Sequence, residues 1–251
     1  MPMTRPLPAA ALAACLMASP LAALDLGDMT QGEQEAFGEA VRSYLLANPE
    51  VIFEAVDVYN AQQEELQSAN DDDLIADNAE AIFNDGVSWV GGNPEGDVTI
   101  VEFLDYRCGY CRRAHPEVGE LIQSDGNIRL IIKELPILGD ASTLSARFAI
   151  AAQQVAGDDA YKAVHDALMA FGGEPGETAF VRIADALDLD AAPIIAQMDS
   201  DEVTAVLAAN AQLAGVLGIR GTPSYVMQDR MLRGYVPLDG MQEIVADIRE
   251  Q

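Results

Sequence analysis

The sequence predicts an α/β fold that carries an inserted helical domain and an N-terminal helical extension. A β-branched and aromatic run at residues 98–104, a helical stretch and a second apolar run at residues 128–134 predict strand, helix and parallel strand. An Ala-rich helical block then fills residues 141–218. A predicted hairpin and a last helix follow this block, so the sheet is expected to resume after it.

The composition fits one sizeable folded domain with an appendage. The chain has 251 residues, of which 50% are hydrophobic, and a formal net charge of −27. Such a charge argues against nucleic acid and against anionic membrane surfaces as partners.

Residues 1–23 have the features of a secretory signal peptide. After Arg5 an apolar, Ala-rich run continues without charge until Asp25, and it is short for a membrane span. An uncleaved anchor is the alternative. Cys15, preceded by Leu-Ala-Ala, resembles a bacterial lipoprotein cleavage box, so lipid anchoring there is a minor alternative to a secreted, periplasmic protein.

Residues 24–86 predict a helical, acidic arm. A first helix begins at Thr30 or Gln31, and Asn48-Pro49 starts a second one. The three aspartates at residues 71–73 are expected to loosen this second helix. Its heptad seam, with spacing 4-3-4-3-4, consists of Ile52, Val56, Tyr59, Gln63, Leu66 and Asn70. The arm is either an oligomerisation element or an extension packed on its own domain.

The domain at residues 87–251 begins with a short strand and turn at residues 87–94. The helices predicted for the insertion cover residues 141–155, 158–171, 178–187, 192–198 and 201–217. The hairpin strands and the last helix are predicted at residues 224–228, 231–235 and 238–249.

Cys108 and Cys111 lie between the first long strand and its helix, the arrangement of a dithiol redox centre. The third cysteine belongs to the predicted signal peptide. A disulfide that closes so short a loop adds little stability, so the pair is expected to serve chemistry.

A metal-binding module is the competing class of function. Cys108, Cys111 and His115 have a spacing that can supply three ligands to copper(I) or zinc(II). The only other histidine, His165, is distant in the sequence. The alternative is that His115 is an ordinary surface histidine.

The order of elements, Cys108-Gly-Tyr-Cys111 and Thr222-Pro223 together resemble the DsbA family of thioredoxin-fold thiol–disulfide oxidoreductases, over residues 87–251. The arm, with Tyr44-Leu-Leu-Ala-Asn-Pro-Glu50, resembles that of ScsC-type members, some of which are trimers. The resemblance implies disulfide exchange with client proteins without a cofactor, a membrane redox partner that resets the dithiol, and a homo-oligomer, dimer or trimer, formed through the arm.

The resemblance also implies roles for the residues around the cysteines. Cys108, at the start of the helix, matches the exposed attacking cysteine, whose thiolate the helix dipole stabilises. Cys111 matches the less exposed resolving thiol. Gly109 and Tyr110 are the dipeptide that tunes the redox poise, and Pro116 kinks the helix.

Glu102, on the strand before the cysteines, matches a buried carboxylate that relays protons to the buried cysteine. We expect Lys133 to pair with it, because a lone buried charge is costly. The alternative is that both point to solvent at strand ends. Thr222-Pro223 matches a cis-proline loop whose backbone pairs with a substrate strand; the alternative is a trans-proline that begins a strand.

Arginines flank the motif, and we infer from the residues alone that they form a basic collar. Arg107, Arg112 and Arg113 surround the cysteines, and Arg220 lies near the proline loop. They would lower the pKa of Cys108 and attract acidic clients; alternatively they cover a solvated face. The Gly-Tyr dipeptide and Thr222 resemble the isomerase side of the superfamily, so an isomerase or reductase is favoured over a disulfide-donating oxidase.

Overall fold

The computed structural model describes residues 29–250, without the side chains of residues 64, 65 and 68. It divides into two compact units, separated between Asn60 and Ala61. The predicted signal peptide and Cys15 lie outside the described residues. Among the described helices, none is both long and apolar enough to cross a membrane.

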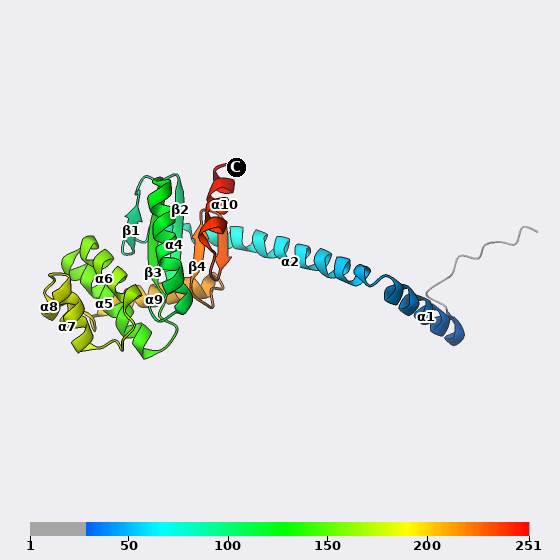
Figure 1. Ribbon diagram of the computed structural model, residues 1–251, viewed down its shortest axis with the longest axis horizontal. Helices are drawn as coiled ribbons and strands as arrows, with labels where there is room; N and C mark the ends of the chain where they lie inside the picture. The colour runs from blue at the N-terminus through cyan, green and yellow to red at the C-terminus, as the bar shows by residue number, and fades with distance from the viewer. Residues whose placement is uncertain (1–28, 251) are drawn as a thin grey trace, which may run out of the picture. The chain divides into compact units, whose positions relative to one another are not determined.

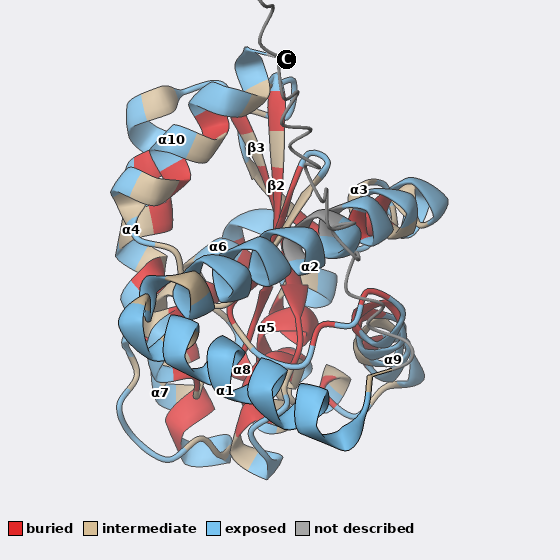
Figure 2. Ribbon diagram, turned by 90° about the vertical axis from the view of Figure 1, so that its right-hand side faces the viewer, coloured by how far each residue is buried: buried red, intermediate tan, exposed pale blue. Residues whose placement is uncertain are grey.

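The first unit contains α1 (Gln31–Ala47) and the first part of α2 (Glu50–Asp77). The helix start predicted at Thr30 or Gln31 is confirmed: α1 begins at Gln31, and the N–H of its N-cap residue, Thr30, donates to Glu33 Oε2 at 2.8 Å. Helix α1 buries none of its residues (Figure 2). Packing against the described part of the chain therefore does little to stabilise this helix.

The second unit is built on a five-stranded sheet in the order β1-β3-β2-β4-β5 (Figure 1). Strands β2 and β3 are parallel, as predicted, and the other neighbours are antiparallel. The strands are β1 (Trp89–Gly92), β2 (Val98–Leu104), β3 (Ile128–Glu134), β4 (Ser224–Met227) and β5 (Arg230–Arg233).

Helix α4 connects the parallel strands, and five helices form the insertion between β3 and β4, as predicted. In Figure 1, α5 to α8 gather in a bundle of their own, and α10 lies beside α4. The helices of this unit, besides the end of α2, are α3 (Ala79–Phe83), α4 (Gly109–Asp125), α5 (Asp140–Ala156), α6 (Asp158–Ala170), α7 (Glu177–Ala186), α8 (Ala191–Gln197), α9 (Asp201–Val216) and α10 (Leu238–Arg249).

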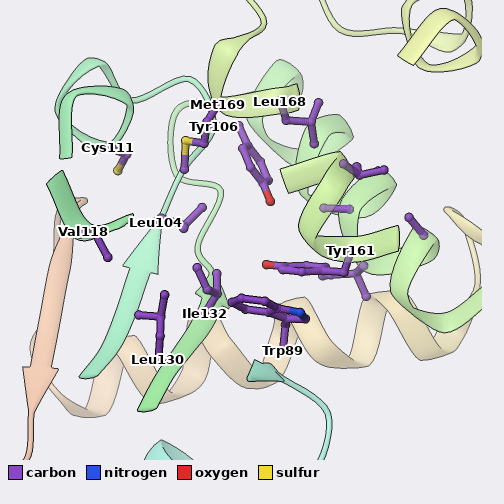
Figure 3. Packing of buried hydrophobic residues seen from close by; sticks show 14 of the residues in the cluster. Trp89, Leu104, Tyr106, Cys111, Val118, Leu130, Ile132, Tyr161, Leu168 and Met169 are labelled. Carbon is purple, nitrogen blue, oxygen red and sulfur yellow. The ribbon is translucent and has the colours of Figure 1, made fainter. Parts of the chain in front are cut away.

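Alternate residues of β2 enter two separate hydrophobic cores, one on each face of the sheet. Ile100 and Leu104 pack in the core that contains both cysteines and residues of α4 to α10 (Figure 3). Val101 and Phe103 pack in the other core, with residues of α2, α3 and α9. Glu102 therefore lies on the same face of the sheet as α4.

The expectation that the three aspartates loosen α2 is wrong, because the helix continues to Asp77. Asp71 is buried and accepts two hydrogen bonds from Arg233 of β5, at 2.7 and 2.8 Å. This ion pair neutralises one of three adjacent charges. It also places the end of α2 in the second unit rather than in a separate arm.

Candidate active site

The two cysteines lie at the start of α4, which begins directly after Cys108. The Cys108 carbonyl accepts from the Arg112 N–H at 3.1 Å, so this residue opens the helix. Both cysteines are free thiols, Cys108 8% exposed and Cys111 fully buried. The expected difference in exposure is present, although Cys108 is more covered than predicted. Pro116 lies inside the helix, as predicted.

The loop opposite the cysteines covers Cys108. The Thr222–Pro223 bond is cis, as predicted. The Cys108 thiol donates to the Thr222 carbonyl at 3.1 Å. Because β4 pairs with β2 directly after Pro223, the sheet itself holds this loop against the start of α4.

Glu102 is buried beneath the cysteines, with Tyr225 opposite it on β4. The Tyr225 hydroxyl donates to Glu102 Oε1 at 3.4 Å. Burial raises the pKa of Glu102 to about 7, although this hydrogen bond lowers it. Burial raises the pKa of Cys111, and the charge of Glu102 raises it further. The carboxyl group and the buried thiol are therefore coupled, because a negative charge on either one disfavours a negative charge on the other.

The predicted pairing of Glu102 with Lys133 is wrong. In the register of the parallel strands Lys133 lies opposite Phe103, and Glu102 lies opposite Ile132. Lys133 belongs to the other face of the sheet, where its ammonium donates to Asp85 at 2.5 Å and to Ser88 at 3.2 Å. Burial opposes ionisation of Asp85, but hydrogen bonds from Lys133, from Ser88 and from the Val87 N–H hold its pKa at about 2.

Asp105 is a site residue that the sequence analysis missed. It is buried, and it accepts backbone N–H bonds from Arg107 at 2.7 Å, Ile137 at 2.9 Å and Leu138 at 3.1 Å. It thereby joins the turn before Cys108 to the loop after β3. The feature of the sequence that could have indicated this role is the position of Asp105 between the strand and the cysteine motif.

The arginines near the motif contact carbonyl groups and an aromatic ring. Arg112 donates to the carbonyls of Tyr106, at 2.7 Å, and Phe171, at 2.5 Å. Arg107 donates to the Gly173 carbonyl at 2.8 Å. Both arginines tie the turn before α4 to the loop between α6 and α7. The predicted effect of the collar on the Cys108 thiolate stays a prediction.

An aromatic surface beside Cys108 was also missed. Tyr110, 61% exposed, lies with its ring centroid 6.0 Å from that of Tyr235. The Arg113 guanidinium lies over the Tyr235 ring at 4.6 Å. Tyr235 follows β5, so only the folded hairpin brings it to this position.

A buried polar cluster lies behind the site. The hydroxyls of Tyr106 and Tyr161 both donate to Glu134 Oε1, at 2.8 and 2.6 Å, and Figure 3 shows them turned toward one another. Burial raises the pKa of Glu134 to about 8. The signal in the sequence was a glutamate at the end of an apolar strand.

The metal-binding arrangement of Cys108, Cys111 and His115 is not formed. His115 points to α6 instead, where its Nε2 lies 3.1 Å from Asp166 Oδ1. Its ring centroid is 4.9 Å from that of His165. The two histidines, distant in the sequence, are therefore neighbours in space.

A dithiol at the start of a helix, with one thiol 8% exposed and the other fully buried, faced by a cis-proline loop, is the arrangement of a thiol–disulfide oxidoreductase with a thioredoxin fold. The profile of the DSBA-like thioredoxin domain matches residues 99–246. The chain belongs to this family. The profile of the copper resistance protein ScsC N-terminal domain matches residues 33–65, within the predicted arm.

Solved structures agree with this assignment. A thioredoxin-like oxidoreductase from Silicibacter pomeroyi is 45% identical, with a TM-score of 0.64, and the match covers 68% of this chain and 98% of that one. A Proteus mirabilis ScsC variant is 25% identical, with a TM-score of 0.66, over 90% of this chain and all of that one. The thiol-disulfide exchange protein alpha-DsbA2 from Wolbachia pipientis is 25% identical, with a TM-score of 0.68, and the match covers 73% of this chain and 98% of that one.

Two sequence relatives are much longer proteins. The Na(+)/H(+) antiporters NhaA 3 of Salinispora tropica and NhaA 1 of Salinispora arenicola are 29% and 31% identical over 156 and 157 residues. The match covers 62% of this chain and 24% of the length of each antiporter.

Proposed function

We propose that this chain is a periplasmic oligomeric disulfide isomerase or reductase that acts on client proteins through Cys108 and Cys111. The observation that carries the proposal is the Cys108 thiol held 3.1 Å from the Thr222 carbonyl. A client segment that pairs with the backbone of this loop brings its disulfide to the attacking sulfur.

In the proposed reaction the Cys108 thiolate attacks one sulfur of a client disulfide. A mixed disulfide forms, and the other client sulfur leaves as a thiolate. In isomerisation, a second client thiolate attacks the mixed disulfide and releases Cys108. In reduction, Cys111 gives its proton to Glu102 and attacks Cys108, which leaves a reduced client and an oxidised Cys108–Cys111 pair. A dithiol partner at the membrane must then reduce that pair.

The proposal of an isomerase or reductase, rather than a disulfide donor, rests on the resemblance of the motif and on the arm. The Gly-Tyr dipeptide and Thr222 are similar to those of isomerases, and the arm matches the ScsC N-terminal domain. Several sites around one client favour repeated exchange over single oxidation. The signal peptide predicted at residues 1–23 and the likeness to a periplasmic thioredoxin-like protein from Salmonella enterica, which is 26% identical, support the periplasm.

Two measurements test the proposal. Cys111→Ser expressed in a bacterial periplasm should accumulate mixed disulfides with clients, and Cys108→Ser, the matched control, should not. Alkylation of the wild-type protein in intact cells should find the pair mostly reduced. A mostly oxidised pair would show a disulfide donor instead, and the absence of mixed disulfides would refute exchange with clients.

A further inference from the structure

The only two histidines of the chain meet an aspartate between α4 and α6. His115, His165 and Asp166 offer ligand atoms that all lie within 4.8 Å of one another. His115 comes from the active-site helix, and the other two come from the inserted helical domain. This side-chain cluster takes no part in the proposed thiol exchange.

The hydrogen bonds behind His165 fix which of its nitrogen atoms is free. Tyr106 gives its hydroxyl proton to Glu134, at 2.8 Å, so its oxygen accepts from His165 Nδ1 at 3.0 Å. A neutral imidazole that donates through Nδ1 has its lone pair on Nε2. A histidine that is oriented through its other ring nitrogen in this way is typical of metal ligands.

Asp166 supplies a carboxylate oxygen beside the two imidazoles. Among the described residues, its buried Oδ1 accepts no hydrogen bond of good geometry, and its nearest polar neighbour is His115 Nε2, an ion-pair partner at 3.1 Å. Oδ2 accepts from Lys162 at 2.5 Å. A carboxylate oxygen without a well-aligned donor is open to a cation.

Open space adjoins the cluster. A cavity of about 280 Å³ is lined by both histidines, by Lys162 and by Glu102. It has room for solvent beside the imidazoles. A metal ion held by three protein ligands keeps a water molecule in its fourth position, and this cavity can hold that water.

We propose that His115, His165 and Asp166 bind one divalent transition-metal ion of the zinc class. Two imidazole nitrogens and a carboxylate oxygen suit zinc, whereas magnesium and calcium prefer oxygen ligands alone. Bonds of about 2.0–2.2 Å place the ligand atoms of a tetrahedral ion roughly 3.3 Å apart, so binding requires the three side chains, whose ligand atoms lie within 4.8 Å of one another, to draw closer together. The ion links α4, which carries Cys111, to α6 of the insertion.

Zinc titration of a chain in which Cys15, Cys108 and Cys111 are replaced by serine tests this site. This background removes thiolate ligands, and excess magnesium occupies hard acidic sites on the surface. We expect one zinc ion per chain by calorimetry. His115→Ala and Asp166→Asn should each weaken binding at least tenfold, and Asp159→Asn, an exposed aspartate on the same helix, should leave it unchanged. Lys162→Gln should strengthen binding, since it removes a competing cation.

Cobalt(II) gives a second measurement on the same protein. Bound at this site it should show the visible bands of a four- or five-coordinate ion with nitrogen and oxygen ligands, and His115→Ala should remove them. The absence of stoichiometric zinc would overturn the proposal. So would zinc binding that survives both His115→Ala and Asp166→Asn. Circular dichroism shows whether His115→Ala or Asp166→Asn has lost its fold. If one of these variants has, the zinc affinity of the other variant decides the test.

Discussion

At the scale of single residues, the interaction between the Glu102 carboxyl group and the Cys111 thiol predicts how fast Cys111 resolves a mixed disulfide. If Glu102 is the base for Cys111, Glu102→Gln should slow attack of Cys111 on a Cys108–peptide disulfide by roughly a hundredfold near pH 7. The wild-type rate should rise with pH around a pKa of about 7, and the variant should lose that step. Rapid-mixing kinetics with a fluorescent peptide measures this.

The opposite result has its own physical meaning. The charge of Glu102 raises the pKa of Cys111, so a carboxylate that acted only through its charge would hinder the thiol. Glu102→Gln would then accelerate resolution. Glu120→Gln, an exposed site on α4, is the control and should change neither the rate nor its pH profile.

The buried carboxyl groups also predict how stability depends on pH. Burial raises the pKa of Glu102 to about 7 and that of Glu134 to about 8, from 4.5. Between the ordinary value of 4.5 and these raised values, the folded chain binds more protons than the unfolded chain. The free energy of unfolding therefore falls as pH rises from about 5 to 8. Glu102 contributes roughly 3 kcal/mol to this change, and Glu134 roughly 5 kcal/mol.

Denaturant titration at several pH values checks this dependence. Glu102→Gln should make the free energy of unfolding depend less on pH up to about pH 7. Glu134→Gln should do the same up to about pH 8. Self-repulsion of the acidic chain contributes in the same direction, so Glu120→Gln, which removes one exposed charge, is the reference. Equal curves for all three variants would mean that no buried carboxyl group is responsible.

At the scale of the elements, the Asp71–Arg233 pair fastens the end of α2 to β5. Asp71→Asn should lower the free energy of unfolding by about 2 kcal/mol, because two charge-assisted hydrogen bonds weaken beside a partly exposed arginine. Asp72→Asn, at the exposed neighbouring position, should change it by less than about 0.5 kcal/mol. Equal losses in the two variants would show that the pair does not hold the helix.

The elements were predictable because their signals are local. The strands at residues 98–104 and 128–134 follow β-branched runs, and glycine and proline separate the first three helices of the insertion. The continuity of α2 was not predictable, because Asp71 depends on a residue 162 positions later.

The candidate site likewise contains features with a local signal in the sequence and features that depend on contacts between distant residues. Cys108, Cys111 and the Thr222–Pro223 loop were recognisable from short motifs. The partner of Lys133 was not, because a parallel register turns it to the face opposite Glu102. Nor was the meeting of His115 with His165, which depends on how α6 packs against α4.

At the scale of the whole molecule, the arm leaves many apolar side chains without a partner in the described chain. Helices α1 and α2 expose Phe37, Val41, Tyr44, Leu46, Ile52, Phe53, Val56, Val58, Tyr59 and Leu66. The heptad positions Ile52, Val56, Tyr59 and Leu66 are all among them. Exposed apolar residues in a heptad pattern are expected to meet the same face of another copy.

Light scattering of the purified chain should therefore give the mass of a dimer or trimer. Val56→Ser together with Tyr59→Ser should give a monomer with an unchanged dithiol, since both residues lie in the first unit. Gln62→Ser, an exposed polar position on α2, is the matched control and should keep the oligomer. Because each copy carries a net charge of −27, association should strengthen as salt screens the repulsion between copies. A monomeric wild-type chain at high salt, or an oligomer that survives the double substitution, would show that this face of the arm is not the contact.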